Sequence, residues 1–398
     1  MGRSDSRRAA PPSAIESAGE SSHSQAARAG GVLRIDLDAV AANYRLLRHR
    51  LTGGARCAAV VKADAYGLGM AEVAPVLFAT GCRDFFVAWL DEAIALRWLL
   101  PDAAIHVFAG ATAATADEFP RHRLIPVLNH LGQIADFSAL AHRRGVPLAA
   151  DIHIDTGMNR LGLPPGEWDQ IIAEPARLAG LAVDSLISHL ACADEPEHPL
   201  NRRQLARFAA ERPRIPALAA ARASLANSAG IFLGPDFHFD LARPGAALYG
   251  LAPHLGGPNP MAQTIRLQGR ILQVRDVDRD MTVGYGAAHR VTAPGRIATV
   301  GVGYADGYLQ ALTNRGHAYI DDIRVPVVGR VSMDLITLDV SQVPPALAVP
   351  DRLVDLIGPH CSADAVAERA GTIGYEILTG LGRRYPRVYV GGAGGAAA

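Results

Sequence analysis

The chain has 398 residues, of which 49% are hydrophobic and 20% charged, a composition typical of a globular protein of about two or three domains. Its 39 basic residues balance 39 acidic ones, which argues against a general affinity for nucleic acid or anionic membranes and favours a small-molecule partner. The four cysteines follow no disulfide or zinc spacing, and the apolar runs are too short to cross a bilayer. We therefore expect a cytoplasmic protein with reduced thiols, no metal and no membrane segment.

Residues 1–30 are rich in Ser, Ala, Gly and Arg and lack the apolar core that a secretory signal needs. We predict a disordered tail here, with a cleaved targeting peptide as the alternative because of the Arg and Ser bias. Residues 393–398 are predicted to form a flexible end.

Between residues 57 and 243, short β-rich runs alternate with longer segments of helical character, the pattern of repeated βα units. The eight strand candidates are Ala59–Lys62, Phe85–Trp89, Ile105–Phe108, Ile125–Leu128, Ala150–Ile154, Ser185–His189, Ser224–Asn227 and Phe239–Arg243. The helix candidates include Met70–Thr80, Asp91–Leu99, His130–Arg143 and Asn201–Glu211. This α/β pattern predicts a (β/α)8 barrel over residues 31–260.

Residues suited to chemistry lie at the ends of these strands or in the loops that follow: Lys62, His189, Ser228 and Arg243. Active sites of (β/α)8 barrels lie at the mouth formed by the carboxyl ends of the strands. We therefore expect these four residues to share one site.

After about residue 260 the sequence changes to alternating apolar and polar runs with frequent Gly, Pro and Asp. The strand candidates are Ile265–Val274, Arg296–Val302, Ala318–Ile320, Arg324–Val328, Leu335–Val340 and Arg352–Ile357. We predict a second, mainly β domain over residues 261–392.

Lys62 stands at the end of the first apolar strand, in the segment VVKADAYGLG of residues 60–69. In a half-buried pocket, a lysine has a lowered pKa and can form a Schiff base with an aldehyde such as pyridoxal phosphate. The alternative is a lysine whose stem packs at the strand end while its ammonium reaches solvent. Lys62 alone does not decide between these two.

The VKADAYGLG loop resembles the cofactor-lysine signature of fold-type III pyridoxal-phosphate enzymes, and of alanine racemases in particular. Further matching segments occur in the family order at residues 155–162 (DTGMNRLG), 188–194 (SHLACAD), 227–230 (NSAG), 242–245 (ARPG), 283–286 (VGYG), 329–334 (GRVSMD) and 372–376 (TIGYE). The resemblance covers nearly the whole chain beyond the tail. It implies a homodimeric isomerase that uses pyridoxal 5'-phosphate to interconvert L- and D-alanine, supplying D-alanine for peptidoglycan.

This resemblance implies a two-base reaction, in which one residue acts on each face of the substrate. Lys62 holds the cofactor and acts on the D-face, whereas Tyr285 of the partner subunit acts on the L-face. The second domain therefore completes the partner's active site. Taken alone, Tyr285 would be an ordinary half-buried sheet tyrosine, and as a base it needs neighbouring positive charge to lower its pKa.

The resemblance also assigns the binding residues. Those implied to bind the cofactor are Lys62, Tyr66, His189, Asn227, Ser228, Arg243, Gly245, Ala246 and Tyr375. Arg243 looks like the arginine that donates to the pyridine nitrogen and leaves it neutral, although a barrel-end salt bridge is its alternative role. His189 occupies the position of an imidazole beside the cofactor ring, although alone it would more often be a core histidine. Arg160 and the Met333 amide correspond to the groups that hold the substrate carboxylate, with Asp334 in support.

His153 is a departure from the family pattern, because many members carry a lysine, often carbamylated, seven residues before the arginine. A histidine cannot present the carbamate's negative oxygen to Arg160. It can stay neutral and accept one hydrogen bond, a chloride or water can take the carbamate's place, or the histidine can point elsewhere. The positioning of Arg160 is therefore open.

Three rival functions remain. A decarboxylase of the same architecture usually places a carboxylate at the pyridine nitrogen, which Arg243 argues against. A racemase for serine or a broader set of amino acids is disfavoured by Tyr375, which narrows the pocket. A non-catalytic pyridoxal-phosphate carrier resembles only the barrel half, so the second domain with Tyr285 and Met333 favours an enzyme.

Overall fold

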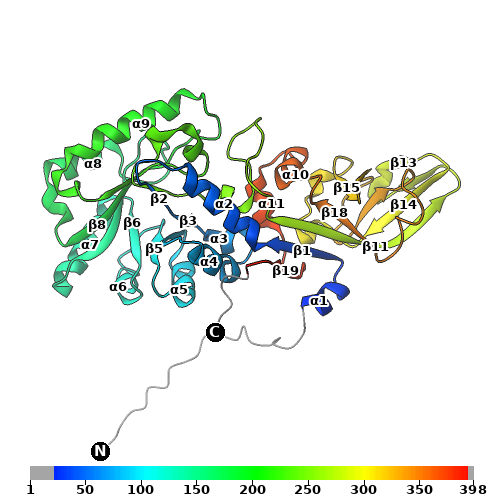
Figure 1. The fold of residues 1–398 in the computed structure, drawn as a ribbon, viewed down its shortest axis with the longest axis horizontal. Helices are drawn as coiled ribbons and strands as arrows, with labels where there is room; N and C mark the ends of the chain where they lie inside the picture. The colour runs from blue at the N-terminus through cyan, green and yellow to red at the C-terminus, as the bar shows by residue number, and fades with distance from the viewer. Residues whose placement is uncertain (1–21, 393–398) are drawn as a thin grey trace, which may run out of the picture.

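The structure is a computed structural model that describes residues 22–392, and it consists of a barrel and a β-rich domain side by side (Figure 1). Residues 1–21 and the expected flexible end at 393–398 lie outside the described residues. The prediction of a disordered tail is wrong for residues 22–28, which form helix α1 (Ser22–Arg28). Arg270 explains this order, because its guanidinium donates to the backbone carbonyls of Ala26 at 2.9 Å and Ala29 at 3.2 Å.

The predicted barrel is confirmed. Its strands are β2 (Arg56–Cys57), β3 (Ala59–Val60), β4 (Asp84–Val87), β5 (Ala104–Val107), β6 (Ile125–Leu128), β7 (Leu148–His153), β8 (Leu181–Ile187), β9 (Arg222–Ser224) and β10 (Leu241–Ala242). Strands β3 to β9 pair in chain order, all parallel, and β10 pairs with β2. Backbone bonds of 2.9 Å from Ala58 to Ala242 and from Val60 to Pro244 close the barrel. Each of the eight predicted strands overlaps one of these.

Helices cover the outside of the barrel: α2 (Leu37–Arg50), α4 (Met70–Ala79), α5 (Leu90–Leu99), α6 (Glu118–Arg121), α7 (Leu131–Arg144), α8 (Pro165–Ala173) and α9 (Pro199–Glu211). The four predicted helices are therefore confirmed within two residues at each end. Helix α7 shows why such a segment folds: Ile134, Phe137 and Leu140 form one buried stripe. It ends at Gly145, whose φ of 67° suits a helix C-cap.

The second domain is built around an eight-stranded sheet. Its strands, with a separate hairpin β12–β13, are β1 (Gly31–Asp36), β11 (Ile265–Val277), β12 (Met281–Val283), β13 (His289–Val291), β14 (Gly295–Val300), β15 (His317–Ile320), β16 (Ile323–Pro326), β17 (Ile336–Asp339), β18 (Leu353–Ile357) and β19 (Arg387–Val390). Helices α10 (Ala363–Ala370) and α11 (Gly374–Gly380) complete it. All six predicted strands of this domain are present.

Strand β1 corrects the predicted boundary at residue 31. It pairs antiparallel with β11 and parallel with β19, so residues 31–36 belong to the second sheet and not to the barrel. Its side chains Leu33 and Ile35 are fully buried. A short strand shows its own periodicity in the sequence but does not show which distant strand it will pair with.

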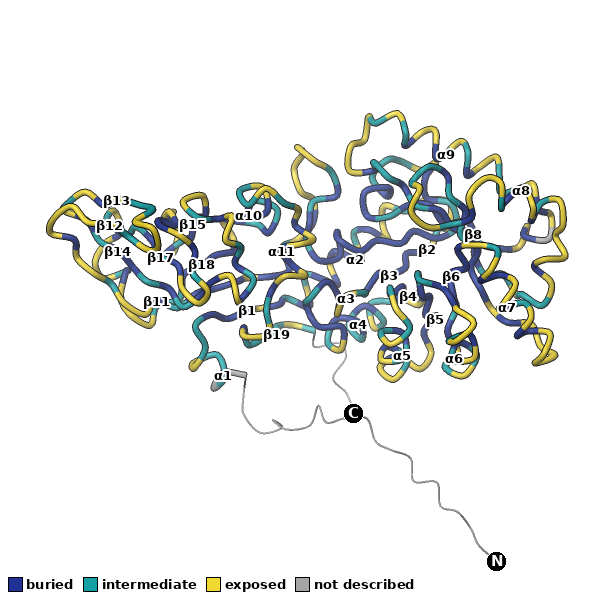
Figure 2. The backbone as a smooth tube through the Cα atoms, turned by 180° about the vertical axis from the view of Figure 1, so that it is seen from behind, coloured by how far each residue is buried: buried dark blue, intermediate teal, exposed yellow. Residues whose placement is uncertain are grey.

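Most of the buried apolar side chains form one large cluster that runs from the barrel through β1 into the second sheet, as the dark blue segments of Figure 2 indicate. Val277, Val291, Ile297 and Val328 form a separate small cluster in the second domain. The two domains therefore share a core. In the described residues, every helix falls short of the length and apolar character needed to cross a bilayer.

Candidate active site

A cavity of about 440 Å³ opens at the carboxyl ends of the barrel strands, where the sequence predicted a site. The predicted site residues that line it are Lys62, Tyr66, His153, Arg160, His189, Asn227, Ser228, Arg243, Gly245, Ala246 and Tyr375. Tyr375 comes from helix α11, so the second domain of the same chain also reaches the cavity.

Lys62 begins α3 (Lys62–Tyr66), a turn with unusual backbone geometry. The φ angles of Ala63, Asp64, Ala65 and Tyr66 lie between 53° and 58°, so this is one turn of left-handed helix. Because Lys62 and Tyr66 stand at its two ends, the turn directs both side chains into the cavity. Lys62 is also the only lysine in the 398 residues.

The ammonium of Lys62 lies 5.9 Å from the centre of the Phe108 ring. Burial and the neighbouring Arg160 lower the pKa of Lys62, while the carboxylate of Glu92 partly opposes them. A larger fraction of the side chain is therefore the neutral, nucleophilic amine than in a solvent-exposed lysine.

One end of the cavity presents neutral donors suited to a phosphate. The Ser228 hydroxyl accepts hydrogen bonds from the backbone N–H groups of Gly245 (2.9 Å) and Ala247 (3.2 Å). A Cβ on Gly245 would lie 2.3 Å from the Tyr66 hydroxyl oxygen. Any residue other than glycine at this position would therefore clash with that hydroxyl. The hydroxyl group of Tyr66 and the small residues of this loop thus form a cradle that fits a phosphate group.

Arg243 follows β10 and is buried. Its guanidinium donates to the Ser224 hydroxyl and to the Ser188 carbonyl, while its Nε has no partner among the described residues. Burial lowers the pKa of Arg243 to about 10, with Asp151 opposing, so the side chain remains charged at neutral pH. A buried donor with unused capacity fits a ring nitrogen that accepts a hydrogen bond.

Positive charge dominates the cavity. Lys62, Arg160 and Arg243 line it, and none of the described residues that line it is Asp or Glu. Burial and the charge of Arg243 lower the pKa of His189 well below its usual range, so this histidine is neutral. The cavity therefore fits a molecule with several negative charges, and pyridoxal phosphate together with an amino-acid carboxylate meets that requirement.

His153 lines the cavity and does not point elsewhere. Its Nδ1 lies 2.8 Å from Asn129 Oδ1, and the Asn129 amide nitrogen donates to the carbonyls of Phe108 (2.9 Å) and Val127 (2.8 Å). The Asn129 oxygen is thus an acceptor, so Nδ1 of His153 carries the proton and Nε2 is an acceptor. Burial and Arg243 lower the pKa of His153 to about 3, which keeps it neutral.

The loop that presents Arg160 is shaped by Asp155. Its carboxylate accepts hydrogen bonds from the backbone N–H groups of Gly157 (2.8 Å), Met158 (2.9 Å) and Asn159 (3.0 Å). Arg160 lines the cavity and is also exposed to solvent. Arg160 is therefore available to an anion that enters from outside.

Three predicted site residues do not line the cavity of their own chain: Tyr285, Met333 and Asp334. Tyr285 begins η7 (Tyr285–Ala287), between β12 and β13, at the end of the second domain away from the barrel (Figure 2). Asp334 is paired with Arg384 at 2.7 Å. Tyr285 and Met333 remain 72% and 53% exposed.

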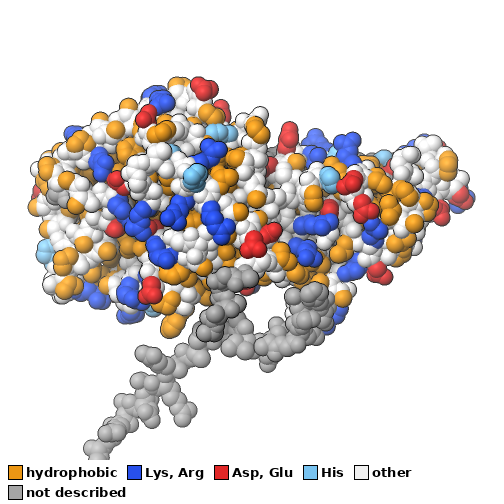
Figure 3. Space-filling view, viewed as in Figure 1, with side chains coloured by type: hydrophobic (Ala, Val, Ile, Leu, Met, Phe, Trp, Pro, Cys, Tyr) orange, Lys and Arg blue, Asp and Glu red, His pale blue; other side chains and the backbone are white. Residues whose placement is uncertain are grey.

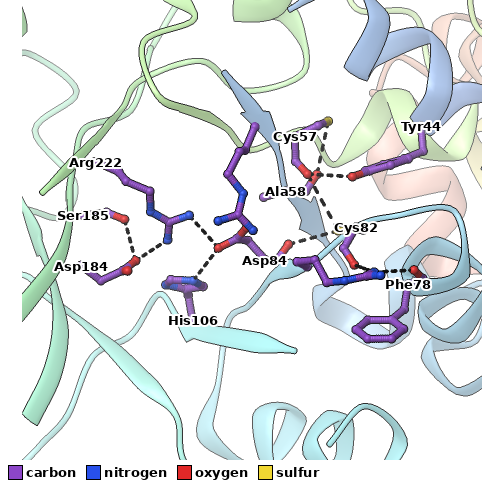
Figure 4. A network of polar contacts seen from close by, with 12 residues as sticks. Tyr44, Cys57, Ala58, Phe78, Cys82, Asp84, His106, Asp184, Ser185 and Arg222 are labelled. Carbon is purple, nitrogen blue, oxygen red and sulfur yellow. Dashed lines mark hydrogen bonds and ion pairs between the residues drawn. The ribbon is translucent and has the colours of Figure 1, made fainter. Parts of the chain in front are cut away.

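Phe86 separates Arg243 from a second, partly buried network of polar side chains. The Arg243 guanidinium lies 5.9 Å from the Phe86 ring centre, and His106 stacks on that ring at 4.3 Å. His106 faces Asp84, which also pairs with Arg222 at 2.8 Å (Figure 4). Arg222 pairs in turn with Asp184, so the network runs across the barrel interior from one strand to the next.

Sequence reasoning missed several residues around the cavity, among them Trp89, Phe108, Leu161 and Glu92. Trp89 and Phe108 directly follow or extend barrel strands, so the rule used for Lys62 and Arg243 could have found them. Glu92 lies on a helix and carries no such signal.

Comparison with known proteins identifies close relatives of both domains. Residues 35–253 match the family described as alanine racemase, N-terminal domain, and residues 264–389 match alanine racemase, C-terminal domain. The alanine racemase of Rhodospirillum rubrum is 54% identical over 365 residues, which cover 92% of this chain and 97% of the relative. That of Brucella abortus is 47% identical over 376 residues, covering 91% and 94%.

Solved structures agree with the sequence matches. Alanine racemase from Bartonella henselae, with covalently bound pyridoxal phosphate, superimposes with a TM-score of 0.86 at 38% identity, covering 91% of this chain and all of that one. The biosynthetic alanine racemase of Pseudomonas aeruginosa gives a TM-score of 0.82 at 34% identity, with coverage of 91% and 100%.

Proposed function

Because the chain belongs to the alanine racemase family of pyridoxal-phosphate isomerases, we propose that it interconverts L- and D-alanine with one acid/base residue on each face of the substrate. Lys62 serves the D-face and Tyr285 of the partner subunit serves the L-face. The observation that supports a shared site is the separation of these two residues within one chain. Lys62 lines the cavity, whereas Tyr285 is exposed at the distant end of the second domain.

The residues that would hold the cofactor are those of the cavity. Lys62 would bind its aldehyde, Arg243 its ring nitrogen, and the cradle of Tyr66, Ser228, Gly245 and Ala246 its phosphate. His189, Asn227 and Tyr375 would complete its surroundings. When bound, pyridoxal phosphate withdraws electrons from an amino acid joined to it and so makes the Cα proton acidic.

Racemisation needs a proton removed on one face and returned on the other, so a single base is not enough. The lowered pKa of Lys62 makes its amine available to hold or release that proton near neutral pH. The arginines of the cavity would stabilise a phenolate of a tyrosine brought there by a second subunit. The absence of Asp and Glu among the described lining residues supports this assignment.

Arg160 and the backbone amide of the partner subunit's Met333 would hold the substrate carboxylate. Neutral His153, with its Nε2 as an acceptor, would support Arg160 without repelling it, and Asp334 would support the Met333 loop through Arg384. Tyr375 would limit the room for the substrate side chain, which favours alanine.

Exposed apolar groups support a homodimer with shared sites. The barrel mouth exposes Trp89 and Leu161, and the second domain exposes Tyr285, Tyr304 and Met333. On the face shown in Figure 3, hydrophobic side chains gather along the outer part of the second domain. In a symmetric dimer, the two patches of one chain would cover the complementary patches of the other.

We also propose a cytoplasmic enzyme that supplies D-alanine for peptidoglycan. The four cysteines are free, three of them buried, which suits a reducing compartment. Relatives from Rhodospirillum rubrum and Brucella abortus are bacterial, and the Pseudomonas aeruginosa relative is described as biosynthetic.

A complementation experiment tests the shared site. Lys62→Ala and Tyr285→Phe subunits are co-expressed with different tags, the mixed dimer is purified, and racemisation of L-alanine is followed by circular dichroism, with L-serine as a comparison substrate. If the site is shared, the mixed dimer contains one intact site and has about half the wild-type activity, while neither variant homodimer racemises alanine in either direction. An inactive mixed dimer would mean that both residues act within one chain.

A further inference from the structure

The left-handed turn that carries Lys62 needs outside support. Left-handed helical geometry costs roughly 1–2 kcal/mol for each residue other than glycine, and four consecutive residues, Ala63 to Tyr66, adopt it here. Such a conformation persists only where the surroundings determine it. The contacts of the turn therefore show which groups hold Lys62 in place.

The end of the turn is held from the second domain. The guanidinium of Arg387 donates to the Gly67 carbonyl at 3.2 Å, and the Tyr389 hydroxyl donates to the Leu68 carbonyl at 3.0 Å. The Asp64 carboxylate accepts the N–H of Met70 at 2.7 Å. All of these contacts lie beyond Lys62 in the chain, so they do not fix the beginning of the turn.

Apart from the backbone hydrogen bond from the Ala65 N–H to the Val61 carbonyl at 2.9 Å, the beginning of the turn is held by one side chain, Glu92 of helix α5. Its Oε1 accepts the N–H of Ala63, the residue after Lys62, at 2.6 Å. Its Oε2 accepts the N–H groups of Ala88 at 2.8 Å and Trp89 at 3.1 Å, directly after strand β4. Glu92, which lies 29 residues after Ala63 in the sequence, thus joins the lysine turn to the adjacent strand end through its two oxygens.

We propose that Glu92 is a positioning residue for the racemisation reaction, which fixes the backbone at Lys62 through the N–H of Ala63. This inference rests on the proposed function of Lys62. Among the described residues of the turn, only Ala63 forms a hydrogen bond with Glu92. This hydrogen bond therefore acts specifically on the peptide group that follows Lys62.

The charge of Glu92 has its own effect. Burial and Arg160 lower the pKa of Lys62, and the Glu92 carboxylate opposes them. Without this charge, Lys62 would lose protons at a lower pH and would be a weaker acid/base partner for an amino acid. Glu92 therefore acts on both the place and the protonation of the amine.

Glutamine at position 92 separates this role from simple helix capping. Both carboxylate oxygens are acceptors, whereas the amide of Glu92→Gln has one acceptor and an NH2 group that must face either Ala63 or the Ala88–Trp89 pair. Glu92→Asp keeps the charge but is too short to join both sides. A matched control is Glu167→Gln, since the Glu167 carboxylate accepts the Leu131 N–H at 2.9 Å in another βα unit, away from Lys62.

The single lysine of the chain allows a direct test. Reductive methylation of the cofactor-free protein with ¹³C-formaldehyde labels Lys62 and the terminal amine, and NMR titration then gives the Lys62 pKa. In Glu92→Gln we expect this pKa to fall by roughly half a unit or more, and kcat of the holoenzyme to fall roughly tenfold to a hundredfold. In Glu92→Asp the pKa of Lys62 should stay at the wild-type value while kcat falls. In Glu167→Gln both the Lys62 pKa and kcat should stay at their wild-type values.

Two results would overturn the inference: a Glu92→Gln enzyme with wild-type pKa and kcat, or equal losses in Glu92→Gln and Glu167→Gln. A racemase that stays active after Lys62→Ala would instead refute the proposed function. The two failures are therefore distinguishable in one set of proteins.

Discussion

His106 Nδ1 lies 2.7 Å from Asp151 Oδ2, and both side chains are completely buried inside the barrel. The other ring nitrogen, Nε2, faces Asp84 Oδ1 at 3.7 Å. Burial alone would lower the pKa of His106, but the two carboxylates raise it to about 9, so the ring is an imidazolium at neutral pH. A positive charge thus lies between two aspartates in the core.

This arrangement makes stability depend on pH. Because the pKa of His106 is higher in the folded state than its ordinary 6.5, its contribution is fully present below pH 6.5 and is lost as the pH rises through about 9. The full contribution is roughly 3 kcal/mol. Urea unfolding should therefore give a lower free energy of unfolding at pH 9.5 than at pH 7, and His106→Gln should remove this slope. A variant with the wild-type slope would disprove the assignment.

The same network resembles a metal site, since single ligand atoms of His106, Asp151 and Asp184 lie within 4.8 Å of one another. The cations are already present, however, because Arg222 pairs with Asp184 and the positively charged His106 lies against Asp151. A divalent ion would have to displace a proton in a compensated network. We expect the melting temperature to be the same with EDTA and with added Zn²⁺; a metal-dependent rise of several degrees would contradict this charge balance.

Phe86 links this network to the active site, because its ring contacts His106 on one face and lies under Arg243. Phe86→Ala should lower the free energy of unfolding by about 3–5 kcal/mol. Phe137 is a matched control, since it is equally buried but packs on Phe119 under the outer helices. Phe137→Ala should cause a similar loss of stability, whereas only Phe86→Ala should also reduce kcat at a temperature where both variants are folded.

Arg243 offers a test of geometry apart from charge. Arg243→Lys keeps a positive charge but cannot reach the Ser224 hydroxyl and the Ser188 carbonyl together, as the planar guanidinium does. We expect a loss of roughly tenfold to a hundredfold in kcat/KM. Steady-state racemisation in both directions is the measurement, and a conservative exchange with wild-type kinetics would show that only the charge matters.

His153 should stay neutral throughout the working range, because its pKa is lowered to about 3. The KM for alanine should therefore show no inflection near pH 6.5. Asn129→Asp places a carboxylate 2.8 Å from the imidazole, should raise the pKa of His153, and should bring such an inflection into the profile. Gln133→Glu, whose side chain contacts the Asn129 backbone instead, serves as the control. An inflection near pH 6.5 in the KM profile of the wild-type enzyme would contradict the assignment of His153 as neutral.

Much of the fold could be predicted because the barrel repeats one local pattern. Each strand is a short apolar run, and residues such as Lys62 and Arg243 follow strand ends that must meet at one mouth. The pairing of strands that are far apart in the sequence produces no local sequence pattern. This is why β1, which pairs with β11, was assigned to the wrong domain. Helix α1 was missed because Arg270, far away in the sequence, supplies its contacts.

The candidate site was predictable to a similar extent. Strand ends and family segments identified the lining residues, but a helix residue such as Glu92 becomes relevant only through its bond to the Ala63 backbone. The sequence also could not place Tyr285, because its position relative to the cavity depends on how the two domains pack.

The pairing of β1 with β19 sets the time at which the protein can be completed. Contacts such as Gly392 N–H to Asp38 Oδ1 join residues 354 positions apart. At ribosomal rates of roughly 5–20 residues per second, β1 waits roughly 20–70 s for its last neighbour. During this interval its exposed edge, with Leu33 and Ile35 not yet buried, can pair with other nascent chains. Early folding of the barrel would shorten the search by bringing the first strand close to where the last one emerges.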